Sequence, residues 1–152
     1  MQRTLTFLGG LFLFILISFG SVALWSQTYE PEAKAFVEDS LREISSDWTG
    51  DRLVKRAAPE LFNGSGGVEQ LNAMISELSS LGPLKNIESL GGTGFGYNWK
   101  SGQYIFANYV TNARFDNGDA TIRIGLVRRE GQWLITGFHI RPMIGIHPNK
   151  QT

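Results

Sequence analysis

The hydrophobic period of the chain changes at Gly82-Pro83, and this change limits the folds that the chain can adopt. Before it, apolar residues recur every three or four positions, which predicts amphipathic helices. After it, apolar and polar residues alternate, as around Ile122 and Ile124, which predicts half-buried strands. Helices first and strands later indicate an α+β domain in which helices pack on an antiparallel sheet.

Three helices are predicted in the first part of the domain. The first begins at Pro31 and ends before Gly50. Its apolar stripe consists of Ala33, Val37, Leu41, Ile44 and Trp48. Residues 51–58 predict a shorter second helix, and residues 63–67, rich in Gly, Asn and Ser, predict a loop. The third helix covers residues 68–81 and ends at a glycine that can cap it.

Four strands are predicted after the helices, over residues 84–90, 104–115, 120–129 and 133–140. Asn117-Gly118 is a strong hairpin signal between the second and third strands, and Glu130-Gly131 predicts the next tight turn. Residues 91–96 are rich in glycine and predict a bulge or a mobile turn. Long strands joined in this way twist strongly, so we expect a curved, cone-shaped sheet with the three helices on its inner face.

The N-terminal part of the chain carries an uncharged apolar segment, LTFLGGLFLFILISFGSVALW, over residues 5–25. As a helix rising ~1.5 Å per residue it is long enough to cross a hydrocarbon layer of ~30 Å. Arg3 precedes it and Glu30 follows it, which predicts a cytoplasmic N-terminus and an exported remainder. The segment is therefore expected to be an anchor in the inner membrane, or a signal peptide cleaved near Ala23.

These boundaries divide the chain into five parts. They are a cytoplasmic stub of residues 1–4, the anchor or signal peptide 5–25, a linker 26–30, a folded domain 31–141 and a tail 142–152. The folded domain is expected in the periplasm, either tethered to the inner membrane or released after cleavage.

The charge and cysteine content exclude several kinds of function. Fourteen basic and fourteen acidic residues cancel, so the chain gives no reason to expect a nucleic-acid partner. Residues 26–100 carry seven Lys and Arg against eleven Asp and Glu, whereas residues 101–152 carry six against three. The chain has no cysteine, which excludes thiol nucleophiles, disulfides and thiolate metal sites.

Several segments together resemble one superfamily of folds. They are the helix that ends near Trp48, the Ala57–Phe62 segment AAPELF, the Leu81-Gly82-Pro83 stop and the strands within ANYVTNARFDNGDATIRIGLVRREGQWLITGFHI. Over about residues 31–141 this order resembles the nuclear-transport-factor-two-like superfamily, also called the cystatin-like or ketosteroid-isomerase-like fold. The resemblance implies a cone between helices and sheet. The superfamily is known to include isomerases, dehydratases, transport and assembly factors and structural modules, so the resemblance implies a fold rather than one activity.

Five side chains on the predicted strands are candidates for a ligand site, namely Asn108, Asn112, Arg114, His139 and Arg141. The first three share parity on one strand and should share a face. Strict alternation along the last strand places His139 on the face of Ile135, Gly137 and Arg141. A polar row of this kind could line a pocket for an anionic or hydroxylated ligand, or be the solvent face of a one-sided sheet.

His139 is also the residue that a catalytic role would require. Catalytic members of the superfamily are known for an Asp or His base in the cone, where apolar surroundings tune its pKa. The carboxylates of the predicted sheet are Asp116, Asp119 and Glu130, and all of them lie at turns, so none is placed to orient an imidazole. His139 and His147 alone give too few ligands for zinc. We expect no catalytic residue, no metal and no cofactor.

The sequence therefore predicts a membrane-tethered, exported module that binds a protein partner or a small ligand, or has a structural role. One alternative is a small enzyme of isomerase or dehydratase type that uses His139 as its base. Another is an assembly component of a secretion or envelope complex. The strands would also allow a homodimer formed through the sheet.

Overall fold

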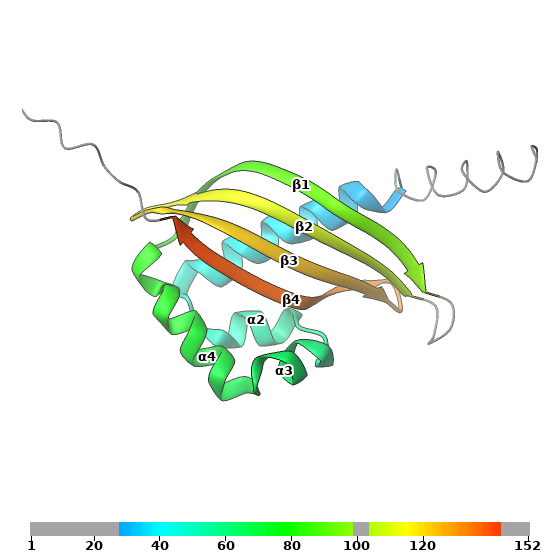
Figure 1. Ribbon diagram of the computed structural model, residues 1–152, viewed down its shortest axis with the longest axis horizontal. Helices are drawn as coiled ribbons and strands as arrows, with labels where there is room; N and C mark the ends of the chain where they lie inside the picture. The colour runs from blue at the N-terminus through cyan, green and yellow to red at the C-terminus, as the bar shows by residue number, and fades with distance from the viewer. Residues whose placement is uncertain (1–27, 99–103, 144–152) are drawn as a thin grey trace, which may run out of the picture. The chain divides into compact units, whose positions relative to one another are not determined.

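The computed structural model describes residues 28–98 and 104–143, which form an α+β arrangement (Figure 1). The helices are a first helix over residues 28–47, α2 (Gly50–Arg56), α3 (Pro59–Ser65), α4 (Val68–Glu77) and the 3-10 helix η1 (Leu78–Leu81). The strands are β1 (Leu84–Asn98), β2 (Tyr104–Phe115), β3 (Asp119–Arg129) and β4 (Gln132–Met143). The strands pair antiparallel in the order β1-β2-β3-β4, so β1 and β4 are the edges. The predicted class, helices followed by a four-stranded antiparallel sheet, is confirmed.

The described residues do not include two of the predicted segments. The apolar segment 5–25 and most of the tail, residues 144–152, lie outside the described residues. Over residues 28–98 and 104–143, no helix is long and apolar enough to cross a membrane. Residues 28–30, which the sequence assigned to a linker, already belong to the first helix.

The two faces of the sheet differ in burial. We call the face that packs against the first helix the inner face and the opposite one the outer face. On β2 and β3 the buried inner residues are Ala107, Tyr109, Thr111, Ala113, Phe115, Ala120, Ile122, Ile124 and Leu126. The residues between them are mostly half-buried or exposed, except Val127. This alternation is the two-residue period predicted for half-buried strands, and it places the core between the sheet and the helices.

From Ala33 onward, the first helix lies across the inner face (Figure 1), and its predicted apolar stripe is buried. At its end, the ring centroids of Trp48 and Phe115 are 5.5 Å apart. The indole Nε1–H of Trp48 donates to the carbonyl oxygen of Gly82 (2.9 Å), and the N–H of Leu84 donates to Ser45 Oγ (3.2 Å). These contacts join the end of the first helix to the start of β1, so the helix has a fixed position on the sheet.

Gly82 makes the change from helix to strand possible. It has φ +73°, and a Cβ at this position would lie 2.9 Å from Cβ of Asp116. The chain on either side of it is hydrogen-bonded to the β2–β3 turn, because Asn117 N–H donates to Leu81 O (2.9 Å) and Asp116 N–H to Pro83 O (3.0 Å). The predicted glycine stop is confirmed, and a side chain there would meet both strain and a clash.

The predicted loop over residues 63–67 is largely wrong, because α3 continues to Ser65. Pro59 suits the first turn of this helix, and Leu61 is buried against the core, so tertiary packing holds a short helix that local composition disfavours. Gly66, with φ +76°, is its C-cap, and the N–H of Gly67 donates to Phe62 O (3.1 Å). The described residues therefore contain four α-helices, one more than predicted.

Two strands are longer than the sequence suggested. β1 continues through the glycines at 91–96, since β2 supplies a pairing partner along this stretch, with register shifts that mark irregularities. β4 continues to Met143 and includes Pro142, which was assigned to the tail. Proline is tolerated there because β4 is an edge strand, where one side of the backbone needs no partner.

Candidate binding site

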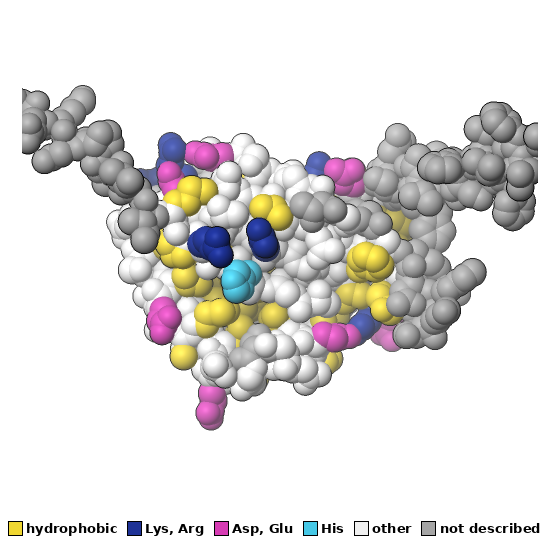
Figure 2. All heavy atoms as spheres, viewed as in Figure 1, with side chains coloured by type: hydrophobic (Ala, Val, Ile, Leu, Met, Phe, Trp, Pro, Cys, Tyr) yellow, Lys and Arg dark blue, Asp and Glu magenta, His cyan; other side chains and the backbone are white. Residues whose placement is uncertain are grey.

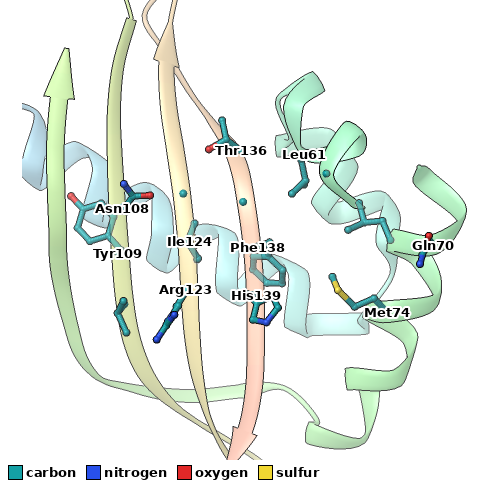
Figure 3. Close-up of a pocket in the computed structure, with 15 residues that line it drawn as sticks. Leu61, Gln70, Met74, Asn108, Tyr109, Arg123, Ile124, Thr136, Phe138 and His139 are labelled. Atoms are coloured by element: carbon teal, nitrogen blue, oxygen red, sulfur yellow. The ribbon is translucent and has the colours of Figure 1, made fainter. Parts of the chain in front are cut away.

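A wide hollow with a volume of about 970 Å³ lies where the sheet approaches α3 and α4. One wall comes from β2, β3 and the edge strand β4, and the other from the two helices (Figure 3). The polar side chains of the strand wall are Asn108, Arg123, Thr136 and His139. The side chains of the helical wall are Leu61, Gln70, Leu71 and Met74. The hollow is thus mainly polar over the sheet and mainly apolar beside the helices.

A backbone contact holds the two walls together. The N–H of Ala58 donates to the carbonyl oxygen of Ile135 (2.8 Å), and Ala57 forms a parallel bridge with the same residue of β4. Ala58 is the N-cap of α3, so this bond fixes where the helix begins relative to the sheet edge. The separation of the two walls is therefore set by main-chain atoms.

The floor of the hollow is bare backbone. Gly125 of β3 and Gly137 of β4 are directly paired, and both line the hollow. A Cβ at Gly137 would meet only atoms of Gly125, at 3.8 and 4.0 Å, whereas a Cβ at Gly125 would lie 3.0 Å from Thr136 Oγ1 and 3.3 Å from Asn108 Oδ1. Paired glycines in a sheet leave room for a ligand to approach the main chain, and two hydrogen-bonding side chains flank this gap.

A β-bulge at Thr136 decides which way His139 points. The residues on either side of Thr136 pair with consecutive residues of β3, so Thr136 is an extra residue in β4. The prediction that His139 shares a face with Ile135 is therefore wrong. Ile135 is completely buried on the inner face together with Phe138, whereas His139 is exposed on the outer face.

The same bulge places His139 opposite Arg123. Directly opposed residues of an antiparallel pair have Cβ atoms about 5 Å apart, so the imidazole and the guanidinium can reach the same small group. Both residues are exposed. Among the described residues, no Asp or Glu lines the hollow or forms an ion pair with either of them. Two nitrogen-bearing side chains thus face a hollow whose described lining contains no carboxylate.

Two other arginines of the sheet, Arg114 and Arg129, are paired with carboxylates. Arg114 pairs with Glu88 (2.8 Å) and with Asp119 (3.1 Å). Arg129 pairs with Glu60 of α3, and its hydrogen bond holds the pKa of that carboxyl below its usual value. Arg123 therefore differs from Arg114 and Arg129, because it has no carboxylate partner among the described residues.

The five candidates from the sequence separate into two groups. His139 and Asn108 line the hollow. Arg141 is on the outer face two residues beyond His139, but it does not line the hollow. Asn112 accepts a hydrogen bond at Oδ1 from a threonine hydroxyl of β3 (3.0 Å), and Arg114 is held in its ion pairs. The site brings together two of the five.

Sequence reasoning missed most of the hollow. Arg123 lies within the predicted strand 120–129 but was not placed next to His139, because the sequence does not show that Thr136 is an extra residue. The pair Gly125 and Gly137 could have been noticed, since glycine inside a strand pattern often marks a close backbone approach. Met74 and the rest of the helical wall follow only from the packing of α3 and α4 beside β4.

On the inner face, the described residues place no His, Asp or Glu side chain in the core. The buried polar side chains of the described residues are Ser40, Ser45 and Thr111, and no His, Asp or Glu is among them. The space between helix and sheet is occupied instead by large apolar side chains such as Tyr109, Phe115 and Ile124. Within the described residues there is also no group of three His, Asp or Glu that could hold a metal ion. His147 lies outside them.

No protein-family model matches this chain, and no curated protein and no solved structure matches it. The geometry of the hollow therefore carries the functional proposal.

Proposed function

We propose that this chain is a membrane-tethered, exported binding module that holds a small ligand in the hollow between β4 and the helices and performs no chemistry on it. The observation that carries the proposal is the pair Arg123 and His139. They are opposed across two strands, beside a glycine floor, with no carboxylate from the described residues. A concave site with a few convergent polar groups and an apolar wall is the usual form of a small-molecule site.

The absence of catalysis is argued from the surroundings of His139. A histidine base works best when a carboxylate orients its ring and when its environment is apolar. His139 is instead exposed on the outer face, opposite another basic residue, and the described part of the chain brings no carboxylate to it. These features favour binding of an anion by His139 over removal of a proton by it.

The tether and the location are proposed from the sequence. The uncharged apolar segment 5–25, with Arg3 before it and Glu30 after it, supports an anchor with the domain on the outer side of the inner membrane. Cleavage near Ala23 would release the same domain into the periplasm. The intact mass of the protein isolated from cells distinguishes the two, because cleavage removes the whole apolar segment.

Membership of the nuclear-transport-factor-two-like superfamily remains a proposal of the same kind. It is supported by the order of the elements, with helices first and a curved antiparallel meander after them (Figure 1). Many members of that superfamily are known for sites in the cone, on the inner face. The hollow proposed here has its polar wall on the outer face, so the binding role does not depend on the membership.

Binding is tested on the full chain in lipid nanodiscs, with carbon-13 in the histidine rings and the methionine methyl groups. The chain has two histidines and three methionines, so the signals of His139 and Met74 are assigned from single substitutions. We expect a set of small organic anions and neutral molecules to include some that shift both signals in a saturable way. If no molecule in the set shifts either signal, the hollow is not a binding site.

A further inference from the structure

We infer that the ligand of this hollow is an elongated amphipathic oxyanion. Its negatively charged head lies between Arg123 and His139 on the outer face, and its apolar body passes over β4 to the wall formed by α3 and α4. This inference rests on the proposed binding function and adds the chemical class of the ligand.

The position of the head follows from charge. Arg123 and His139 are cross-strand neighbours, and Arg141 follows two residues along the same face. Figure 2 shows the histidine on this face with basic side chains beside it. In the described part of the chain none of these three side chains has a carboxylate partner, whereas Arg114 and Arg129 do. An oxyanion bound here would supply the missing partner through charge-assisted hydrogen bonds.

The position of the body follows from the chemistry of the other wall. Leu61 of α3 and Leu71 of α4 line the hollow together with the half-buried thioether of Met74, and Phe138 reaches it from β4. Figure 2 shows a group of hydrophobic side chains directly below the histidine in this view, and others elsewhere on the same face. Methionine adapts its shape to an apolar ligand at small cost. A wholly polar ligand would leave this wall without a complementary surface.

The size of the hollow excludes a simple inorganic ion as its full occupant. At about 970 Å³ it is at the upper end of the ~300–1,000 Å³ typical of sites for small organic ligands. Gly125 and Gly137 leave the floor open over two strands, so a chain can cross the edge of the sheet close to the backbone. An oxyanion with an extended apolar body fills both ends of this space.

Four probes separate the parts of the inference, all used with the full chain in nanodiscs of zwitterionic lipid. Octanoate has the anionic head and the body. Acetate has the head only, octyltrimethylammonium has the body with a positive head, and octyl phosphate replaces the carboxylate by another oxyanion. We expect octanoate to shift both the His139 ring signals and the Met74 methyl signal with one dissociation constant, and acetate to bind at least about tenfold more weakly. The cation is expected to leave the His139 signals unchanged.

Octyl phosphate distinguishes the sources of such a ligand. Affinity for it above that for octanoate indicates a phosphorylated head, as in lysolipids, whereas affinity below it indicates a free carboxylic acid. Either result supports the amphipathic oxyanion.

Two substitutions and one control locate the binding. Arg123→Gln removes the charge at an exposed position and should weaken octanoate binding by about 10- to 100-fold. Gly137→Ile fills the floor at a position where a Cβ meets no atom closer than 3.8 Å, and it should abolish binding while the protein stays folded. Arg114→Gln is the matched control, because Arg114 is an exposed arginine of the same sheet face that lies outside the hollow. Its affinity should equal that of the wild type.

The outcomes that overturn the inference are distinct from those that overturn the binding function. Octanoate affinity that is unchanged in both Arg123→Gln and Gly137→Ile would mean that the chain binds elsewhere, and equal shifts of His139 with octyltrimethylammonium would remove the role of charge. If neutral molecules shift the two signals but octanoate and octyl phosphate do not, the binding function stands and the ligand class is wrong. If no molecule shifts them, both proposals fail.

Discussion

Two arginine-rich regions of this protein use the same side chain in opposite ways. In the helices, Arg56 donates to Glu43 Oε2 (2.7 Å), to Ser40 Oγ (3.0 Å) and to Asp39 Oδ2 (2.7 Å). On the sheet, Arg123 lies beside His139 on one wall of the hollow and has no carboxylate partner among the described residues. The carboxylates that pair with Arg56 belong to the protein itself, whereas an anion that pairs with Arg123 would come from a bound ligand.

The helical region extends beyond Arg56. Arg52 bridges Glu43 (3.3 Å) and Asp47 (3.2 Å), so two guanidiniums and three carboxylates tie the first helix to α2. Hydrogen bonds from Arg56 hold the pKa of Glu43 below its usual value. A network of this kind contributes more than isolated surface pairs do, and its groups are already satisfied. The comparison indicates that an arginine is evidence for a binding site only where the folded chain supplies no carboxylate to pair with it.

The largest expected effect concerns the buried inner face of β4. This strand forms part of one wall of the hollow and is hydrogen-bonded to the start of α3 in the other wall. Trp133 begins the buried row of this strand and is only 6% exposed. Trp133→Ala should lower the free energy of unfolding by about 3–5 kcal/mol, because it leaves a large cavity. Gln132→Ala, at the exposed neighbouring position, should change it by less than about 0.5 kcal/mol. Chemical denaturation of both variants checks this, and equal stabilities would contradict the assignment of the faces.

The next effect separates the two arginine regions by stability. Arg56→Ala should cost about 2 kcal/mol, since it leaves Ser40 and Asp39 without this donor and Glu43 with Arg52 alone. Arg123→Ala should change the free energy of unfolding by less than about 0.5 kcal/mol, because no ion pair is lost. The measurement is the unfolding midpoint and slope in urea. A cost at Arg123 similar to that at Arg56 would mean that Arg123 is structural.

The third effect concerns ligand affinity, for which the arginine on the sheet should matter and the arginine in the helical network should not. Arg123→Gln should weaken the binding of an amphipathic anion about 10- to 100-fold, whereas Arg52→Gln should leave the affinity unchanged. The physical reason is that Arg52 is already occupied by Glu43 and Asp47 and lies outside the hollow. Calorimetric titration of the two variants with octanoate measures the contrast, and a loss of affinity in the Arg52 variant would break it.

The fold was more predictable from the sequence than the site, and the reason is visible in β4. The apolar stripe of the first helix and the Asn117-Gly118 hairpin depend on local spacing, which the sequence displays directly. The position of His139 depends on one extra residue, Thr136, which reverses the parity of everything after it. A bulge arises from the pairing of two strands and from what packs on each face, so the glycine next to Thr136 suggests an irregularity but does not show which residue is extra.

The helical wall was unpredictable for a related reason. α3 forms in a stretch rich in glycine and asparagine because Leu61 is buried and because the N–H of Ala58 bonds to Ile135. Both causes are tertiary. Local propensity predicts a loop at residues 63–67. Packing against the edge strand β4 instead stabilises the helix α3, which completes the hollow.

A smaller effect is expected with pH, and it has a definite sign. The pKa of Glu43 in the folded protein lies below its usual value of 4.5, mainly because of the hydrogen bond from Arg56. The ion-paired carboxylate therefore adds stability above about pH 4.5, and this contribution is lost as the pH falls through the lower pKa of the folded protein. Glu43→Gln should unfold with a weaker dependence on pH between about pH 5 and 3 than the wild type. Arg123→Gln should keep the wild-type dependence. Thermal melts across this range measure both, and an unchanged slope in Glu43→Gln would contradict the network.

The smallest expected effect concerns Arg141 and measures how strongly a charge outside the hollow affects binding. Arg141 lies on the outer face beyond His139 but does not line the hollow, so it acts on a bound anion only through its field. Arg141→Gln should weaken octanoate binding by about two- to threefold at low ionic strength, and this difference should disappear near 1 M salt, where the Debye length is about 3 Å. The effect of Arg123→Gln should persist in part, because a direct hydrogen bond is screened less than a distant charge. If the two substitutions respond alike to salt, Arg123 also acts from a distance, and the head of the ligand does not lie between Arg123 and His139.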